Sequence, residues 1–304
     1  MEYLLLQVLN GVQLGLLMFL LAAGLTLTLG IMDLVNLAHG SLYMMGAYIA
    51  WTLIGVTDSF VLGALLALPA TFLLGVVVEA VVIRKLYARD HLTQVLATFG
   101  LILFFNELVR ALWGPAGKSI AVPPFLNRTI EILPGVPYPA YRFAIIVVGA
   151  LVAILLAWLV ARTRLGMLIR AGASNRRMIG ALGVNIELLF SLVFGLGAVF
   201  AGLAGLMSAP IASVRIGMGD DILILALVII VIGGIGSIKG AFIAAMVVGQ
   251  IDIVGRAFLP DILKTFMSSS AASSAAPAIS QVMVYVLMAA VLVWRPTGLF
   301  GQRT

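Results

Sequence analysis

The chain has 304 residues, of which 63% are hydrophobic and only 10% are charged. Soluble domains carry about 25% charged residues, so this composition excludes a soluble globular protein and indicates a membrane protein. The absence of cysteine excludes disulfide frameworks and thiolate metal sites, and two histidines, His39 and His91, are too few for a histidine-based metal site. The net charge of +6 is interpreted as topogenic charge on cytoplasmic loops, not as a nucleic-acid surface.

The N-terminal segment is predicted to be a transmembrane helix. It begins with Glu2 instead of basic residues, and its apolar run is too long for a signal peptide. Further continuous apolar runs approach the ~20 residues that cross a bilayer as a helix, which favours helices over a barrel. The predicted spans lie near 4–30, 38–55, 60–83, 94–113, 142–161, 188–209, 222–238, 240–259 and 279–294. The predicted fold class is all-α, a polytopic transmembrane helical bundle of about eight or nine spans with broken helices.

The first candidate site is the polar stretch 31–48. Polar side chains at membrane depth usually face the bundle interior or a water-filled cavity. Asn36 and His39 are three residues apart and therefore share one face of a helix. Two interpretations stay open: these residues line or gate a solute pathway, or they form a polar clasp that fixes a helix break, with Gly40 allowing close packing.

The distribution of lysine and arginine predicts the orientation of the chain. One set of segments carries eleven basic residues and the opposite set carries seven. The richer set comprises Arg84, Lys85, Arg89, Arg162, Arg164, Arg170, Arg176, Arg177, Lys239, Arg295 and Arg303. Because basic residues accumulate in cytoplasmic loops, this set is predicted to be cytoplasmic, with the N-terminus outside and the C-terminus inside.

Three connecting segments differ in character. Residues 114–141 are rich in Pro and Gly and are predicted to be an external loop, either an ordered cap or a mere spacer. Residues 162–187 mix apolar and basic residues at helical spacing, which indicates short amphipathic helices at the cytoplasmic membrane surface. Residues 267–280 consist almost entirely of Ser and Ala and are predicted to be a flexible external loop.

Two glycine patterns stand out in the second half of the chain. Small residues at every fourth position of 195–210 are typical of close helix packing. Gly233, Gly234 and Gly236 make a continuous helix unfavourable at that point. Such a break either holds solute or acts as a hinge, or it is a simple turn between two spans.

Four stretches together resemble the bacterial ABC permeases for branched-chain amino acids. They are DLVNLAHGSLYMMGAY (33–48), RLGMLIRAGASNRRMIGALGVN (164–185), GGIGSIKGAF (233–242) and RPTGLFG (295–301). AHG at 38–40 resembles the shorter of the two permeases that pair in these systems. The low-complexity segment departs from the family pattern.

The resemblance implies a single permease domain over 1–304 that imports hydrophobic amino acids across the inner membrane. The chain is then no enzyme and binds no cofactor, because ATP is used by two cytoplasmic ATP-binding subunits. Other implied partners are a second homologous permease, an extracytoplasmic substrate-binding protein and membrane lipid. Nucleic acid is not expected to be a partner. The coupling loop falls within 162–187, and the residues expected to couple it to the ATPase are Arg170, Asn175, Arg176, Arg177, Gly180 and Gly183.

Alternatives remain for solute and for class. Urea or short amides would suit the same mechanism, and a facilitative channel would need no large basic docking loop. Neither mid-membrane acids nor an inverted repeat supports an ion-coupled carrier, and no nucleophile–base set supports an enzyme. The candidate path or gate residues are Asn36, His39, Gly40, Gly233, Gly234 and Gly236.

Overall fold

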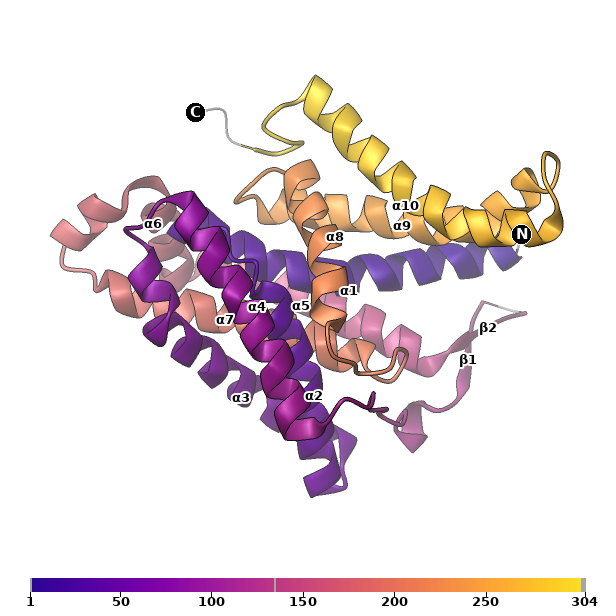
Figure 1. The fold of residues 1–304 in the computed structure, drawn as a ribbon, viewed down its shortest axis with the longest axis horizontal. Helices are drawn as coiled ribbons and strands as arrows, with labels where there is room; N and C mark the ends of the chain where they lie inside the picture. The colour runs from indigo at the N-terminus through magenta and orange to yellow at the C-terminus, as the bar shows by residue number, and fades with distance from the viewer. Residues whose placement is uncertain (1, 134, 302–304) are drawn as a thin grey trace. The chain divides into compact units, whose positions relative to one another are not determined.

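The computed structural model describes residues 2–133 and 135–301, and it is almost entirely helical (Figure 1). Arg303, one of the basic residues used for orientation, lies outside the described residues. The long helices are α1 (Glu2–Met32), α2 (His39–Thr57), α3 (Phe60–Val81), α4 (His91–Trp113), α5 (Ala140–Arg162), α6 (Arg164–Ala181), α7 (Ile186–Ser208), α8 (Met218–Gly233), α9 (Ile238–Leu263) and α10 (Ser269–Trp294). The predicted all-α bundle with broken helices is confirmed.

Seven of these helices are long and apolar enough to cross a membrane, judged by length and composition alone. The other two predicted spans correspond to α2 and α8. Helix α8 has only 16 residues, fewer than the ~20 that a straight crossing needs. Helix α2 opens with His-Gly-Ser, and its first half is buried. The number of apolar helices is therefore roughly consistent with the predicted eight or nine spans.

The chain divides into two compact units. One contains residues 20–121 and 152–226, and the other contains residues 1–19, 122–151 and 227–304. In the first unit, α2, α3 and α7 pack against one another. The close approach depends on glycine, because a methyl group added at Gly46 of α2 would overlap the backbone of Gly202 on α7. The small residues of 195–210 therefore serve helix packing, as predicted.

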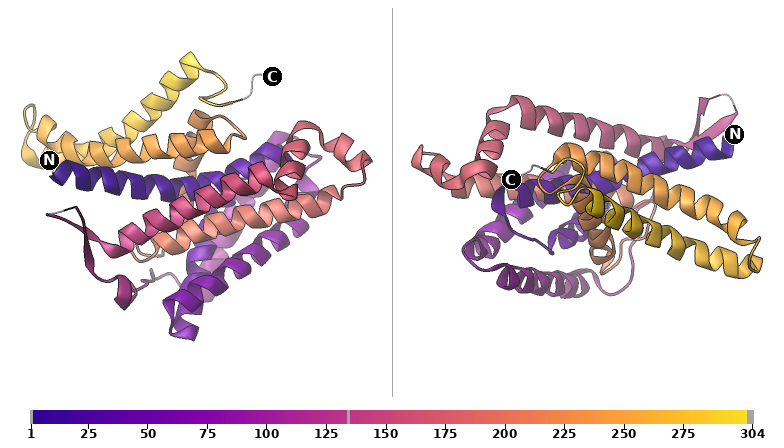
Figure 2. Two further views of the ribbon diagram at one scale, coloured as in Figure 1. Left: turned by 180° about the vertical axis from the view of Figure 1, so that it is seen from behind. Right: turned by 90° about the horizontal axis from the view of Figure 1, so that it is seen from above.

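In the second unit, α9 and α10 form an antiparallel pair (Figure 2). The prediction of a flexible loop at 267–280 is wrong, because α10 begins at Ser269 and runs through this segment. Ser268 caps the helix by accepting a hydrogen bond from the Ala271 amide. Alanine is the strongest helix former, and the small side chains let α10 lie against α9, where Ser280 donates to the Asp252 carbonyl.

The segment predicted to be an external loop is ordered. It contains a short 3₁₀ turn (Pro124–Leu126) and an antiparallel hairpin of β1 (Thr129–Leu133) and β2 (Val136–Pro139). Asn10 of α1 anchors the hairpin, because its side-chain oxygen accepts hydrogen bonds from Tyr138 and Arg142. The segment is thus folded; its residue 134 lies outside the described residues.

Candidate functional site

The polar break between α1 and α2 is built around Asn36. Its side-chain oxygen accepts a hydrogen bond from the Ala38 amide at 3.0 Å, and its carbonyl accepts from the His39 amide at 3.3 Å. These bonds form an Asx turn that starts α2 where Ala38 offers no side-chain cap. Asn36 therefore fixes the helix break, which was one of the two interpretations left open by the sequence.

The same region holds buried polar atoms without hydrogen-bond partners. Asn36 is 1% exposed and His39 is fully buried. The Asn36 side-chain nitrogen has no hydrogen-bond partner, and the His39 imidazole interacts with the backbone of Leu21 at less than strict hydrogen-bond geometry. The imidazole ring occupies the space beside Gly24 of α1, where an added methyl group would lie 2.9 Å from Nε2. Buried polar groups are almost always paired. This cluster of Asn36 and His39 is therefore a candidate for a site whose partner is a solute or water.

Gly40 has a different place. A methyl group added there would overlap the carbonyl oxygen of Gly219 on α8, and the converse holds at Gly219. Gly40 thus allows α2 and the start of α8 to touch through their backbones. Gly40 lies beside the polar cluster. It lets the two backbones come close, but it has no side chain that could bind a solute.

The glycine-rich break between α8 and α9 is confirmed, and it is a tight turn. Helix α8 ends at Gly233, five residues before the predicted end of that span. Gly234 (φ +100°) and Gly236 (φ +79°) both adopt the left-handed region that side chains disfavour. Ser237 then caps α9 by accepting a hydrogen bond from the Gly240 amide at 3.1 Å.

The C-terminal segment 295–301 closes over this break. The amides of Leu299 and Phe300 donate to the carbonyls of Ile232 and Gly233, at 2.8 and 3.0 Å. These carbonyls end α8 and would otherwise have no partner. Gly234 is the contact point, because a methyl group added there would overlap the Gly301 nitrogen. The sequence indicated both motifs separately, but neither carries a signal that they pair.

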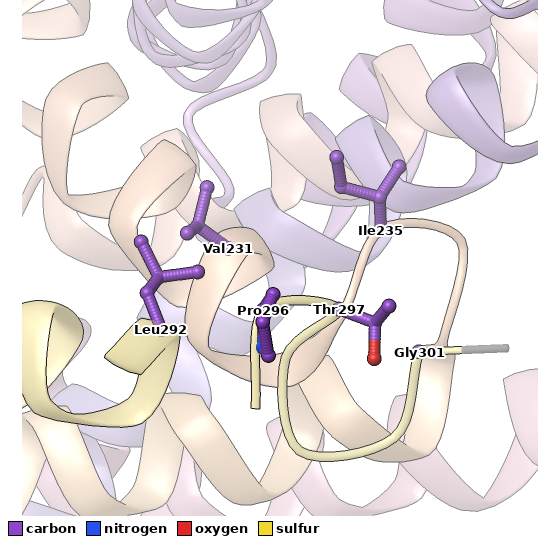
Figure 3. Close-up of a pocket in the computed structure, with 6 residues that line it drawn as sticks. All are labelled: Val231, Ile235, Leu292, Pro296, Thr297 and Gly301. Carbon is purple, nitrogen blue, oxygen red and sulfur yellow. The ribbon is translucent and has the colours of Figure 1, made fainter. Parts of the chain in front are cut away.

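A cavity of about 230 Å³ lies at this junction (Figure 3). Its lining comes from α8, the turn after it, α10 and the C-terminal segment: Val231, Ile235, Leu292, Pro296, Thr297 and Gly301. Apart from the Thr297 hydroxyl, the lining side chains are apolar, and none is titratable. The lining offers no group for acid–base or metal chemistry. Nor is any cluster of metal-ligating side chains found in the part of the chain that the structure describes.

The third candidate region is α6 with the turn that follows it. Asn175 interrupts α6 with non-helical dihedrals (φ −155°, ψ 92°) and caps the second piece by accepting from the Met178 amide. Gly183 (φ +87°) ends the helix in a Schellman motif, in which its amide donates to Gly180 and the Val184 amide donates to Ile179. The predicted amphipathic segment is therefore two short helical pieces joined at a kink.

One face of α6 is exposed and partly apolar. Met167, Met178 and Leu182 are 55–76% exposed, whereas Ile169 and Ile179 are buried. Arg170 lies on the exposed surface. Arg176 and Arg177 belong to α6, but their side chains lie outside what the structure describes. Exposed apolar side chains among basic ones are features of a surface that contacts a protein partner or the membrane.

The candidate residues fall into the two compact units. Asn36, His39, Gly40 and the α6 residues belong to one unit, and Gly233, Gly234 and Gly236 belong to the other.

Comparison with known proteins gives a consistent result. The model of the family described as "Branched-chain amino acid transport system / permease component" matches residues 7–292. The high-affinity branched-chain amino acid transport system permease protein BraD of Pseudomonas aeruginosa is 30% identical, over 97% of this chain and 95% of its own. LivH of Escherichia coli, with the same description, is 27% identical over 99% and 96%. The ribose import permease protein RbsC of Escherichia coli is 26% identical over 76% and 71%. No solved structure matches the chain.

Proposed function

The chain belongs to the family of branched-chain amino acid transport permease components, and from that premise we propose that it is the membrane-spanning subunit of an ATP-driven importer for hydrophobic amino acids. The observation that carries the proposal is the family match over almost the whole chain, together with relatives named for branched-chain amino acid transport. The chain is thus an integral membrane transport subunit and not itself an enzyme.

The composition supports a solute without net charge. The pathway residues proposed from sequence include no acid or base apart from His39, and the chain as a whole is 10% charged. A fixed charge inside a membrane protein is costly unless it is paired, so such a pathway suits a solute without net charge. Leucine, isoleucine and valine meet this condition as zwitterions, and urea and short amides meet it too.

The proposed partners follow from the same premise. Two ATP-binding subunits would dock on the exposed face of α6, where Met167, Met178 and Leu182 offer apolar contact. Since α6 lies within the loop predicted to be cytoplasmic, the N-terminus would lie outside and the C-terminus inside. A second homologous permease and an extracytoplasmic binding protein would complete the importer. ATP would be consumed by the partners, so this chain needs no cofactor of its own.

The proposed path has two parts. The unpaired side-chain nitrogen of Asn36 and the imidazole of His39 would meet the solute or its water when the path opens. Leaving a buried donor or acceptor unpaired costs about 1–3 kcal/mol, and a transient partner would explain why these groups are kept. Gly233, Gly234 and Gly236 would act as a hinge, and Gly40 would let α2 and α8 slide in contact.

The test is transport by the reconstituted importer. The purified chain and its candidate partners are placed in proteoliposomes, and uptake of radiolabelled leucine and urea is measured with and without internal ATP. Leucine uptake that requires ATP and every partner supports the proposal. Uptake of urea alone would keep the ATP-driven mechanism and change the solute, whereas flux through this chain alone without ATP would replace the proposal with a channel.

A further inference from the structure

A buried carboxylate lies near the end of α3. Glu79 is fully buried, and both of its oxygens are engaged. Arg84 binds it through two nitrogens, with Nε at 3.3 Å from Oε1 and Nη2 at 2.9 Å from Oε2. The Tyr87 hydroxyl donates to Oε1 at 2.8 Å and the Ser191 hydroxyl donates to Oε2 at 2.6 Å. Four donors therefore satisfy one buried charge, which is the condition for keeping it at low cost.

Arg84 also joins this carboxylate to the first turn of α7. Its Nη1 donates to Glu187 at 3.1 Å and its Nη2 lies 2.8 Å from the Ser191 hydroxyl. Arg84 is 34% exposed and Glu187 is 71% exposed, so the guanidinium runs from the buried carboxylate to the surface. Only arginine presents several donors in a fixed fork that can serve two carboxylates and a hydroxyl together.

Tyr87 also binds Glu79 and contacts α7. Burial raises the pKa of Tyr87, and its hydrogen bond to the Glu79 carboxylate raises it further, so the phenol remains a donor. Its ring packs edge-on against Phe190 of α7, with ring centroids 5.0 Å apart. Polar and aromatic contacts thus fix the end of α3 to the start of α7.

A short connection joins the end of α6 to the start of α7. The Schellman turn leaves Val184 and Asn185 as the only residues between Gly183 and α7, and Asn185 caps α7 by accepting from the Leu188 amide. Gly172 of α6 packs against Leu189 of α7. A connection this short leaves little slack between the two helices.

We propose that Glu79, Arg84 and Glu187 form a clasp that passes displacement of α6 through α7 to α3. This inference rests on the proposed function, in which α6 receives the movement of the ATP-binding subunits. Arg84 is then a positioning residue: it touches no solute, but it decides whether ATP hydrolysis is converted into transport. The network lies within one compact unit of the chain.

The experiment measures leucine uptake and ATP hydrolysis in the same proteoliposomes that contain the full importer. Arg84→Lys keeps a cation beside Glu79 but cannot bridge to α7, and Glu187→Ala removes the exposed end of the bridge, where loss of folding is not expected. Both variants should lower the leucine transported per ATP hydrolysed by about fivefold or more, the range of ordinary coupling between sites. Arg110→Lys is the matched control, because Arg110 forms a surface pair with Glu107 at 2.9 Å.

A purely structural role would lower uptake and hydrolysis in proportion and leave their ratio unchanged. An unchanged ratio in Arg84→Lys and Glu187→Ala, with coupled transport by the wild type, would overturn the clasp alone. A wild-type importer that fails to couple ATP to leucine uptake would overturn the proposed function, and the clasp with it.

Discussion

Position 234 requires glycine for two reasons, its backbone conformation and its contact with Gly301. The φ of +100° strains any L side chain, and a Cβ would overlap the Gly301 nitrogen. Gly234→Val should therefore cost about 1–3 kcal/mol in backbone strain and displace the C-terminal segment from α8. The expected result is a lower melting temperature together with loss of uptake.

Gly100→Val is the control for this substitution, because Gly100 lies within α4 and an added Cβ there meets open space. A Gly234→Val protein that melts and transports like Gly100→Val would show that neither the left-handed backbone at position 234 nor its contact with the C-terminal segment is required.

At the scale of single residues, a substitution of His39 tests the proposed path. His39→Leu fills nearly the same volume and removes a buried imidazole that lacks a partner at strict hydrogen-bond geometry. Folding stability should stay about level, since replacing a poorly paired buried polar group with an apolar one carries little penalty. Uptake should fall by about tenfold, equivalent to one lost hydrogen bond of about 1.4 kcal/mol. Thermal melts and uptake on one preparation separate the two effects, and unchanged uptake would leave His39 a packing residue.

At the scale of elements, the amphipathic character of α6 was predicted correctly, but its kinked shape was not predicted. Its mixture of apolar and basic residues indicated a surface helix, and the structure agrees. The kink at Asn175 was not visible, because asparagine is an acceptable if weak residue in a helix interior and becomes a cap only where the chain turns. The misassigned start of α10 has a related cause: Ser and Ala suit flexible loops by composition, yet they also suit a helix that must approach another closely.

The basic residues of α6 give the element-scale prediction. Replacing Arg176 and Arg177 with Ala should weaken binding of the ATP-binding subunits by about tenfold, because each exposed ion pair contributes up to about 1 kcal/mol. Binding affinity of detergent-solubilised complexes is the measurement, with membrane insertion checked by yield. Arg128→Ala with Lys264→Ala, on the side predicted to be external, is the control. Equal affinity in both double variants would show that the two arginines do not contribute to docking.

At the scale of the whole molecule, the predicted orientation can be tested because the native chain has no cysteine. Ser119 and Ser174 are both exposed and can be exchanged for cysteine with little change in shape. Ser119→Cys should react with a membrane-impermeant maleimide added to intact spheroplasts, whereas Ser174→Cys should react only after the membrane is opened. The reverse pattern would invert the topology.

The sequence by itself determined the class of the protein, the approximate number of apolar helices, the small-residue packing stripe, and the breaks between α1 and α2 and between α8 and α9. These follow from local properties. Apolar runs are long enough for a bilayer, glycine occurs where a helix is interrupted, and polar residues occur inside otherwise apolar segments, where burying them is costly. It also carried the family resemblance, and with it the function. Only the tertiary structure decided which distant segments meet. The pairing of Leu299 with Ile232, the contact of Gly40 with Gly219 and the bridge from Glu79 to Glu187 join residues far apart in the chain. No local pattern encodes such pairs, because each depends on how packed helices place their ends side by side.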